Sequence, residues 1–180
     1  MAESRDAFPV SGARATIPIP AASVLDESGF RVDAHAVVIG INDYQDPRIP
    51  TLRYAHADAQ AMYDVLTDPT VGRFKPENVT LLLDDQASYK RIKSEIGTRL
   101  PKRTDENSTV CVYFAGHGAP YVDVRNTSRD GMEKYLIPYD ADADDLRASG
   151  LSMEALQDYF GYITSRVGNR TMQIGMQYIF

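Results

Sequence analysis

One histidine in this sequence has the setting of a catalytic base. His117 follows an apolar run, residues 109–115, and stands between Gly116 and Gly118. An imidazole titrates near neutral pH, so it can accept or donate a proton during a reaction. Glycine on both sides lets the backbone turn sharply and lets a substrate chain approach closely. The alternative is a turn histidine that only hydrogen-bonds a neighbouring carbonyl group, and the local sequence leaves both interpretations open.

The single cysteine, Cys111, is a poor nucleophile for this histidine. It lies six residues before His117 on the same apolar run. At ~3.3 Å per residue the two are on the order of 15–20 Å apart along a strand. A nucleophile and its base must lie within ~3 Å of each other. We therefore expect Cys111 to be a core residue.

An acidic stretch offers oxygen ligands without completing a calcium-binding loop. Asp140, Asp142 and Asp144 fill the first, third and fifth positions of an EF-hand pattern. Asp145 then stands where that loop needs glycine, and Leu151 stands where it needs a bidentate glutamate. We assign no metal site and no certain cofactor. The four aspartates are the candidate ligands if calcium binds at all.

The composition is that of one globular domain. Nineteen Lys and Arg residues against 25 Asp and Glu give the 180-residue chain a formal net charge of −6. An acidic domain without a basic stripe is a poor candidate for nucleic-acid binding. No apolar run approaches the ~18–20 residues of a membrane-spanning helix, and the first residues lack the regions of a signal peptide. We therefore expect a cytoplasmic protein that binds neither nucleic acid nor membrane.

Apolar runs predict an α/β fold with a mainly parallel sheet. Residues 36–41, 79–83 and 109–115 are short and apolar throughout, which is typical of strands buried on both faces. The third run is expected to end just before His117, at the carboxyl edge of the sheet, where open α/β sheets have their sites. Residues 121–124 and 134–137 are expected to pair as a hairpin.

The segments between the predicted strands have the periodicity of amphipathic helices. Apolar residues recur every three or four positions over residues 52–66, and again over residues 88–100, where Pro101 is expected to end the helix. A third helix is expected to begin after Ser152, which can cap it.

The sequence predicts that the chain has three parts. Residues 1–33 contain three prolines and no sustained period, so we expect a flexible leader without a core role. Residues 34–167 form the predicted domain. Residues 168–180 form a tail that alternates apolar and polar side chains, as a strand does.

Four segments resemble one family. Residues 114–118, Phe-Ala-Gly-His-Gly, are similar to the histidine motif of the caspase-like cysteine peptidases, in particular their metacaspase and bacterial caspase-family (orthocaspase) branch. Residues 36–44 resemble that family's first strand and loop, residues 52–59 its first-helix entry, and residues 135–142 the segment after its hairpin. Together they cover about residues 34–165 in the family's order.

The resemblance implies a fold and a set of roles. The fold is a caspase-like three-layer αβα sandwich, of which residues 34–167 are the large-subunit part of the catalytic domain. His117 maps onto the histidine that activates a cysteine on the next parallel strand, and Gly118 onto the glycine whose backbone N–H contributes to the oxyanion hole. Asp58 maps onto an aspartate that binds a substrate Arg or Lys. Arg53 is the competing choice, since true caspases use an arginine of this region to bind substrate aspartate.

Residue types alone give Asp58 two explanations. A carboxylate in the first turn of a helix complements the helix dipole. Asp58 also stands three residues after Ala55 and four before Met62, so it lies on or beside the apolar helix face, as a pocket residue would.

The chain departs from the family after residue 167. The family pattern there is a long apolar strand ending in Asp-x-Cys-x-x-Gly, and residues 168–180 contain neither the cysteine nor the aspartate. We therefore expect a C-terminally truncated or altered domain in which the tail either forms a substitute strand or leaves an exposed sheet edge for self-association.

The residues and the resemblance lead to two candidate functions. The first is a cysteine-type endopeptidase domain acting on peptide or protein substrates after Arg or Lys, with this chain inactive for lack of its nucleophile. The second is a non-catalytic caspase-like module that binds peptides or partner proteins.

Overall fold

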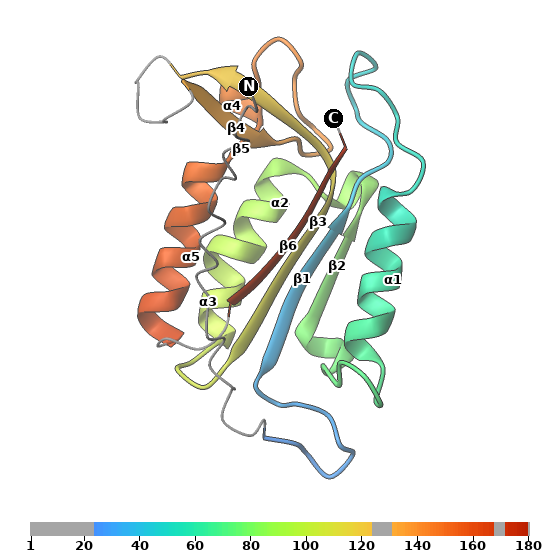
Figure 1. Cartoon of the computed structure of the whole chain (residues 1–180), viewed down its shortest axis with the longest axis vertical. Helices are drawn as coiled ribbons and strands as arrows, with labels where there is room; N and C mark the ends of the chain where they lie inside the picture. Colours follow the sequence, from blue (N-terminus) through green and yellow to red (C-terminus); the bar gives the residue numbers. More distant parts are fainter. Residues whose placement is uncertain (1–23, 124–130, 168–171, 180) are drawn as a thin grey trace, which may run out of the picture.

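The computed structural model describes residues 24–123, 131–167 and 172–179, with the backbone alone for 164–167 and 172–179. A six-stranded sheet runs through the centre of the molecule in the order β2-β1-β3-β4-β5, with β6 beside β3 (Figure 1). The strands are β1 (Ala34–Gly40), β2 (Val79–Leu83), β3 (Thr109–Val122), β4 (Met132–Leu136), β5 (Leu151–Ser152) and β6 (Met172–Ile179). The β1–β2, β1–β3 and β3–β6 pairs are parallel, while β3–β4 and β4–β5 are antiparallel. The prediction of a mainly parallel sheet is therefore confirmed, with an antiparallel portion around β4.

Helices cover both faces of this sheet, which makes three layers (Figure 1). On one face lies α1 (Ala55–Thr67), and on the other lie α2 (Tyr89–Ser94), α3 (Leu100–Arg103) and α5 (Met153–Val167). Short α4 (Leu146–Ser149) precedes β5. Alternate residues of β1 and β3 supply the two cores, since successive side chains of a strand point to opposite faces. The sandwich predicted from the resemblance is confirmed.

The strand that carries His117 is longer than predicted. β3 continues to Val122 instead of ending at residue 115, so His117 lies within a strand and not in a turn. The extension forms because residues 118–122 find an antiparallel partner in residues 132–136. The predicted hairpin is thus present, and its first arm is a direct continuation of the buried strand.

Pro101 does not end the second helix, which corrects the prediction. The chain widens into a π-helical turn over Glu95–Arg99 and then continues as α3, with Pro101 in its first turn. In the wide turn the Leu100 N–H bonds the Glu95 carbonyl oxygen, so the regular α-helical bonding that a proline would interrupt is already broken there. Gly97 in the wide turn packs against α5, where an added Cβ would lie 3.0 Å from the Tyr159 ring. Ser152 caps α5 as predicted, accepting the Ala155 N–H at 3.1 Å.

Residues 24–33, which the sequence places in a leader without a core role, contact the sheet and the segment before β2. Residues 24–33 form a turn at the amino end of the sheet, where Arg31 donates to the Thr109 hydroxyl at 2.6 Å and its backbone N–H donates to the Arg73 carbonyl. Lys75 pairs with Asp26 at 2.8 Å. The periodicity of the sequence does not predict these contacts, because single side chains and one backbone group make them. The rest of the predicted leader lies outside the described residues.

The tail forms a strand, which is one of its two predicted outcomes. β6 pairs with β3 in parallel from Val110–Met172 to His117–Ile179. Within the described ranges no helix is long and apolar enough to cross a membrane.

Deleting residues 168–180 is expected to lower the melting temperature and to promote association. The deletion uncovers the edge of β3 over eight register pairs, and an unpaired strand edge is a template for another chain. Calorimetry and size-exclusion chromatography measure the two effects. A matched control removes residues 1–13 instead. An unchanged melting temperature in a monomeric deletion variant would contradict the pairing of β6 with β3.

Acid pH is expected to destabilise the fold through His35. This residue on β1 is 7% exposed, and its Nδ1 has no hydrogen-bond partner among the described residues. Burial lowers its pKa below 6.5, as does Arg103, against the opposing charges of Asp105 and Asp33. As pH falls below 6.5 the unfolded chain binds a proton that the folded chain does not, so stability is lost, by at most about 1.4 kcal/mol per pH unit.

Melting temperatures between pH 7 and pH 5 test this, with His35→Phe expected to flatten the profile. His56→Gln measures the separate contribution of the His56–Asp84 contact, in which the His56 side chain is 45% exposed. Equal slopes for wild type and His35→Phe would refute the assignment.

Candidate functional site

The His117 imidazole is held by a backbone carbonyl group. Its Nε2 lies 2.7 Å from the carbonyl oxygen of Pro50, in the loop between β1 and α1. A carbonyl oxygen only accepts hydrogen bonds, so Nε2 carries the proton in this contact. In the neutral ring Nδ1 is then the unprotonated nitrogen. The arrangement can present a general base whose orientation is fixed from the opposite side of the ring.

The backbone of His117 is held by Tyr44, which follows β1. The His117 N–H donates to the Tyr44 hydroxyl oxygen at 2.8 Å, and the two rings lie 5.3 Å apart between centroids. Burial raises the pKa of Tyr44 to about 12, so the phenol stays neutral. Gly116 leaves room for this contact, because an added Cβ would lie 2.9 Å from the Phe114 ring and 3.1 Å from the Tyr44 oxygen.

The Gly118 N–H points toward the β6 side of β3. The backbone groups of His117 face the other side, where its N–H meets Tyr44 and its carbonyl oxygen accepts the Ile137 N–H at 3.0 Å. Backbone groups alternate sides along a strand, so those of the next residue face the opposite edge. A donor in this direction can stabilise a developing oxyanion beside His117.

β6 occupies the strand position next to that donor. Its register ends with Ile179 opposite His117. Residues 172–179 contain no cysteine. Cys111 is partly buried and packs against the buried residues of the core under α1. Burial raises the pKa of its thiol, which lowers the thiolate fraction on which reactivity depends.

The two substrate-binding candidates differ in their surroundings. Asp58 lies in the first turn of α1 and is half-buried, whereas Arg53 precedes the helix and is exposed. Burial raises the pKa of Tyr113 on β3, and the negative charge of Asp58 adds to this shift. Tyr113 stands four residues before His117 on the same strand. Asp58 therefore lies on the α1 side of the sheet, in the helix whose Ala55 and Ala59 share a core with Tyr113 of β3.

A polar network ties the carboxyl ends of β1 and β2 to α1. Asp84 accepts the backbone N–H of Asn42 at 2.8 Å and contacts His56 Nδ1 at 3.0 Å. The Asn42 side chain in turn accepts the His56 backbone N–H. Burial raises the pKa of Asp84, but the hydrogen bonds from Asn42 and His56 outweigh it and leave the pKa below its usual value. Asp84 adopts a positive φ of 43° to make these contacts.

The acidic stretch binds an arginine. Arg48 donates to Asp46 at 2.9 and 2.7 Å, to Asp142 at 3.0 Å and to Asp144. These bonds raise the pKa of Arg48 and lower that of Asp46.

The other two calcium candidates have separate roles. Asp140 accepts the Tyr89 N–H, and Asp145 caps α4 through the Ala148 N–H. Among the described residues, no three His, Cys, Asp or Glu side chains form a group that could hold a metal ion. The four aspartates thus do not form a calcium cage, and calcium dependence stays a prediction.

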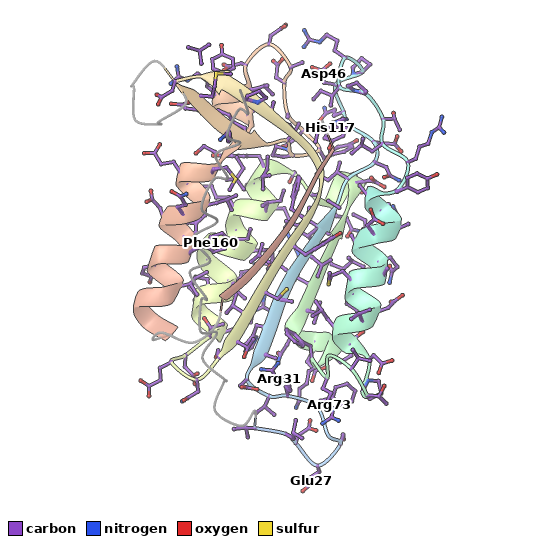
Figure 2. All side chains as sticks on the ribbon, in the orientation of Figure 1. Glu27, Arg31, Asp46, Arg73, His117 and Phe160 are labelled. Carbon is purple, nitrogen blue, oxygen red and sulfur yellow. The ribbon has the colours of Figure 1, made fainter. Side chains whose placement is uncertain are left out.

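The site lies at one end of the sheet. Figure 2 shows His117 at the same end of the molecule as Asp46, with Arg31 and Arg73 at the opposite end. The sequence model of the caspase domain matches residues 33–161, which include every side chain of this site. The chain belongs to the caspase-domain family. Its resemblance to the metacaspase branch is confirmed by metacaspase-1 of Candida glabrata, 30% identical over 110 residues.

This caspase domain matches only parts of its relatives. The metacaspase-1 alignment covers 58% of the chain and 27% of that protein. Among solved structures, a protein from Geobacter sulfurreducens aligns with a TM-score of 0.64 at 19% identity, covering 81% of this chain and 50% of the other. The Drosophila initiator caspase Dronc aligns with a TM-score of 0.48 at 12% identity, covering 99% and 59%. The chain thus spans about a quarter to three-fifths of these proteins.

Sequence reasoning missed the residues that hold His117. Tyr44 closes a segment that was singled out for its likeness to the family, but nothing in the pattern assigned its hydroxyl to a backbone N–H. Pro50 acts through a carbonyl oxygen, which every residue has, so no sequence signal marks it. Arg48 and Asp46 are two apart in a polar loop and are typical of a solvated surface.

Tyr44→Phe is expected to destabilise the site locally. It leaves the His117 N–H without its acceptor, at a cost of about 1–3 kcal/mol. Thermal unfolding and the His117 amide resonance measure the effect. Tyr54→Phe is the matched control, because Tyr54 is 66% exposed. A Tyr44→Phe variant with wild-type stability and an unmoved His117 resonance would contradict this contact.

Proposed function

We propose that this chain carries the histidine side of a cysteine endopeptidase site that acts on peptides after Arg or Lys. His117 is the general base, the Gly118 N–H is an oxyanion donor, and Asp58 binds the basic side chain of the substrate. The 180-residue chain itself does not hydrolyse peptides, because it has no cysteine beside His117.

The contact between His117 Nε2 and the Pro50 carbonyl oxygen, 2.7 Å, is the observation that carries this proposal. Pro50 is 67 residues away in the sequence, so this is not the bond to a neighbouring carbonyl group that a turn histidine would make. Here the bond fixes the tautomer and leaves Nδ1 to take a proton from a thiol. The Gly118 donor beside it suits acyl transfer, in which negative charge develops on the carbonyl oxygen of the substrate.

The choice of Asp58 over Arg53 rests on burial and placement. A half-buried carboxylate next to Tyr113 can bind a guanidinium or ammonium group in a shielded environment, where the attraction is stronger than in water. Arg53 is exposed, and an exposed ion pair contributes little.

The second candidate function is a non-catalytic module that binds peptides or partner proteins. β6 favours it, since this strand pairs with β3 as far as His117 without providing a thiol. In that case the same groups bind a peptide chain but break no bond.

Placing a thiol opposite His117 tests the catalytic proposal. Ile179→Cys puts it at the register position paired with His117, and register neighbours share one face of a sheet. An arginine peptidyl acyloxymethyl ketone is expected to alkylate this variant at least about tenfold faster than Gln177→Cys, the matched control two residues away, because a base within reach forms the thiolate. Mass spectrometry identifies the modified residue.

Two further variants assign the roles. Adding His117→Ala to Ile179→Cys is expected to remove the rate advantage, and adding Asp58→Asn is expected to remove the preference for an arginine over a glutamine reagent. Equal rates for Ile179→Cys and Gln177→Cys would refute His117 as the base.

The unmodified chain is expected to show no turnover of Arg- or Lys-terminated peptide substrates. Without a nucleophile, an oxyanion donor and binding leave only weak residual catalysis. A fluorogenic assay measures this, with Cys111→Ser as the control. Robust turnover that disappears with His117→Ala would overturn the claim of inactivity.

A further inference from the structure

An open hollow lies beside His117, on the side where the β1–α1 loop meets the segment before α4. Its floor includes His117 and Gly118, and its walls are largely apolar. None of the residues lining it belongs to α1, so it is separate from the surroundings of Asp58. The apolar wall residues are Ile49, Pro50, Ala119, Ile137, Ala143 and Leu146.

The two loops that form the hollow are joined by ion pairs. Arg48, next to Ile49, binds Asp142 and Asp144 of the opposite loop, and the Ala143 N–H donates to Asp46 at 3.0 Å. The β1–α1 loop, which carries Arg48 and Ile49, also places the Pro50 carbonyl oxygen against His117. The wall of the hollow and the support of the histidine therefore belong to one loop, which these ion pairs and the Ala143–Asp46 hydrogen bond join to the segment before α4.

The hollow has the size for one side chain. Its volume is about 200 Å³, whereas pockets for whole small ligands run from about 300 to 1,000 Å³. Its place beside the base and the oxyanion donor means that a peptide lying across His117 passes over it. We propose that this hollow is a subsite for one aliphatic side chain of the substrate peptide, additional to the basic side chain at Asp58. This inference rests on the proposed function.

The charges of the rim decide against an acidic occupant. Arg48 alone would attract a carboxylate, but its guanidinium already binds three of them. One positive and three negative charges leave the group with a net charge of −2, which repels an acidic side chain. Burial of an aliphatic side chain against Ile137, which is 3% exposed, needs no polar partner.

Titration of the ¹⁵N-labelled chain with blocked hexapeptides tests the subsite. Each peptide carries one arginine and, at each neighbouring position in turn, leucine, serine or aspartate. At one position, leucine is expected to tighten binding roughly fivefold to tenfold relative to serine, and aspartate is expected to weaken it. The amide resonances of Ala119 and Ala143 are expected to shift with the leucine peptide.

Variants of the wall locate the effect. Ala143→Trp fills the hollow and is expected to abolish the leucine advantage, while Ala148→Trp, at an exposed position of α4, is the matched control. Leu146→Asn makes the wall polar without added bulk, and keeps the test valid if Ala143→Trp misfolds. Both variants are expected to retain the preference for arginine over glutamine.

The outcomes separate the subsite from the proposed function. Equal binding of leucine and serine peptides at every position, with the arginine preference intact, overturns the subsite and leaves the role of Asp58 standing. A leucine advantage that survives both wall variants also overturns the subsite. If the unmodified chain shows no preference for arginine over glutamine peptides, the proposed role of Asp58 is wrong, whether or not leucine binds in the hollow.

Discussion

Burial of β1 on both faces is the constraint on which the rest of this structure depends. All seven residues of Ala34–Gly40 are buried, and β1 pairs with β2 on one side and β3 on the other. Apolar side chains must then be covered from both faces, which requires helices in both outer layers. At the carboxyl end of β1 the helix packs directly against the strand backbone. An added Cβ on Gly40 would lie 2.5 Å from both the Ala55 carbonyl oxygen and the Ala59 Cβ. α1 thus packs directly on β1, and the half-buried Asp58 lies in the first turn of this helix.

The site follows from this constraint because its parts leave the sheet at one edge. The loop after β1 provides Tyr44, Arg48 and Pro50, and β3 provides His117. Most of the contacts that fix the histidine involve backbone groups, whose positions are set by strand pairing. Ion pairs of Arg48 with the segment before α4 then hold the loop in place. Positioning of the histidine is therefore shared between the sheet and the loop that these ion pairs join to the segment before α4.

β6 completes the backbone pairing of β3 but carries no cysteine. The strand pairs with β3 over the length that brings it to His117, and it does so with a sequence that contains no cysteine. Backbone pairing needs only an extended chain with apolar and β-compatible residues, whereas acyl transfer needs one thiol at one place. The pairing of the sheet therefore does not by itself supply a thiol, and family membership and activity are separate questions here.

The sequence by itself determined the strands, the helices and their layers, because buried strands and amphipathic helices have periods that can be read locally. It also singled out His117, Gly118 and Asp58, through residue types and the likeness of whole segments to a family. The end of β3, the passage of the helix through Pro101 and the anchoring of residues 24–33 depended on partners distant in the chain, so only the tertiary structure decided them. The same holds for the support of His117: a carbonyl oxygen of Pro50 and a hydroxyl of Tyr44 acquire a role only when folding brings them within 2.7 and 2.8 Å of the histidine.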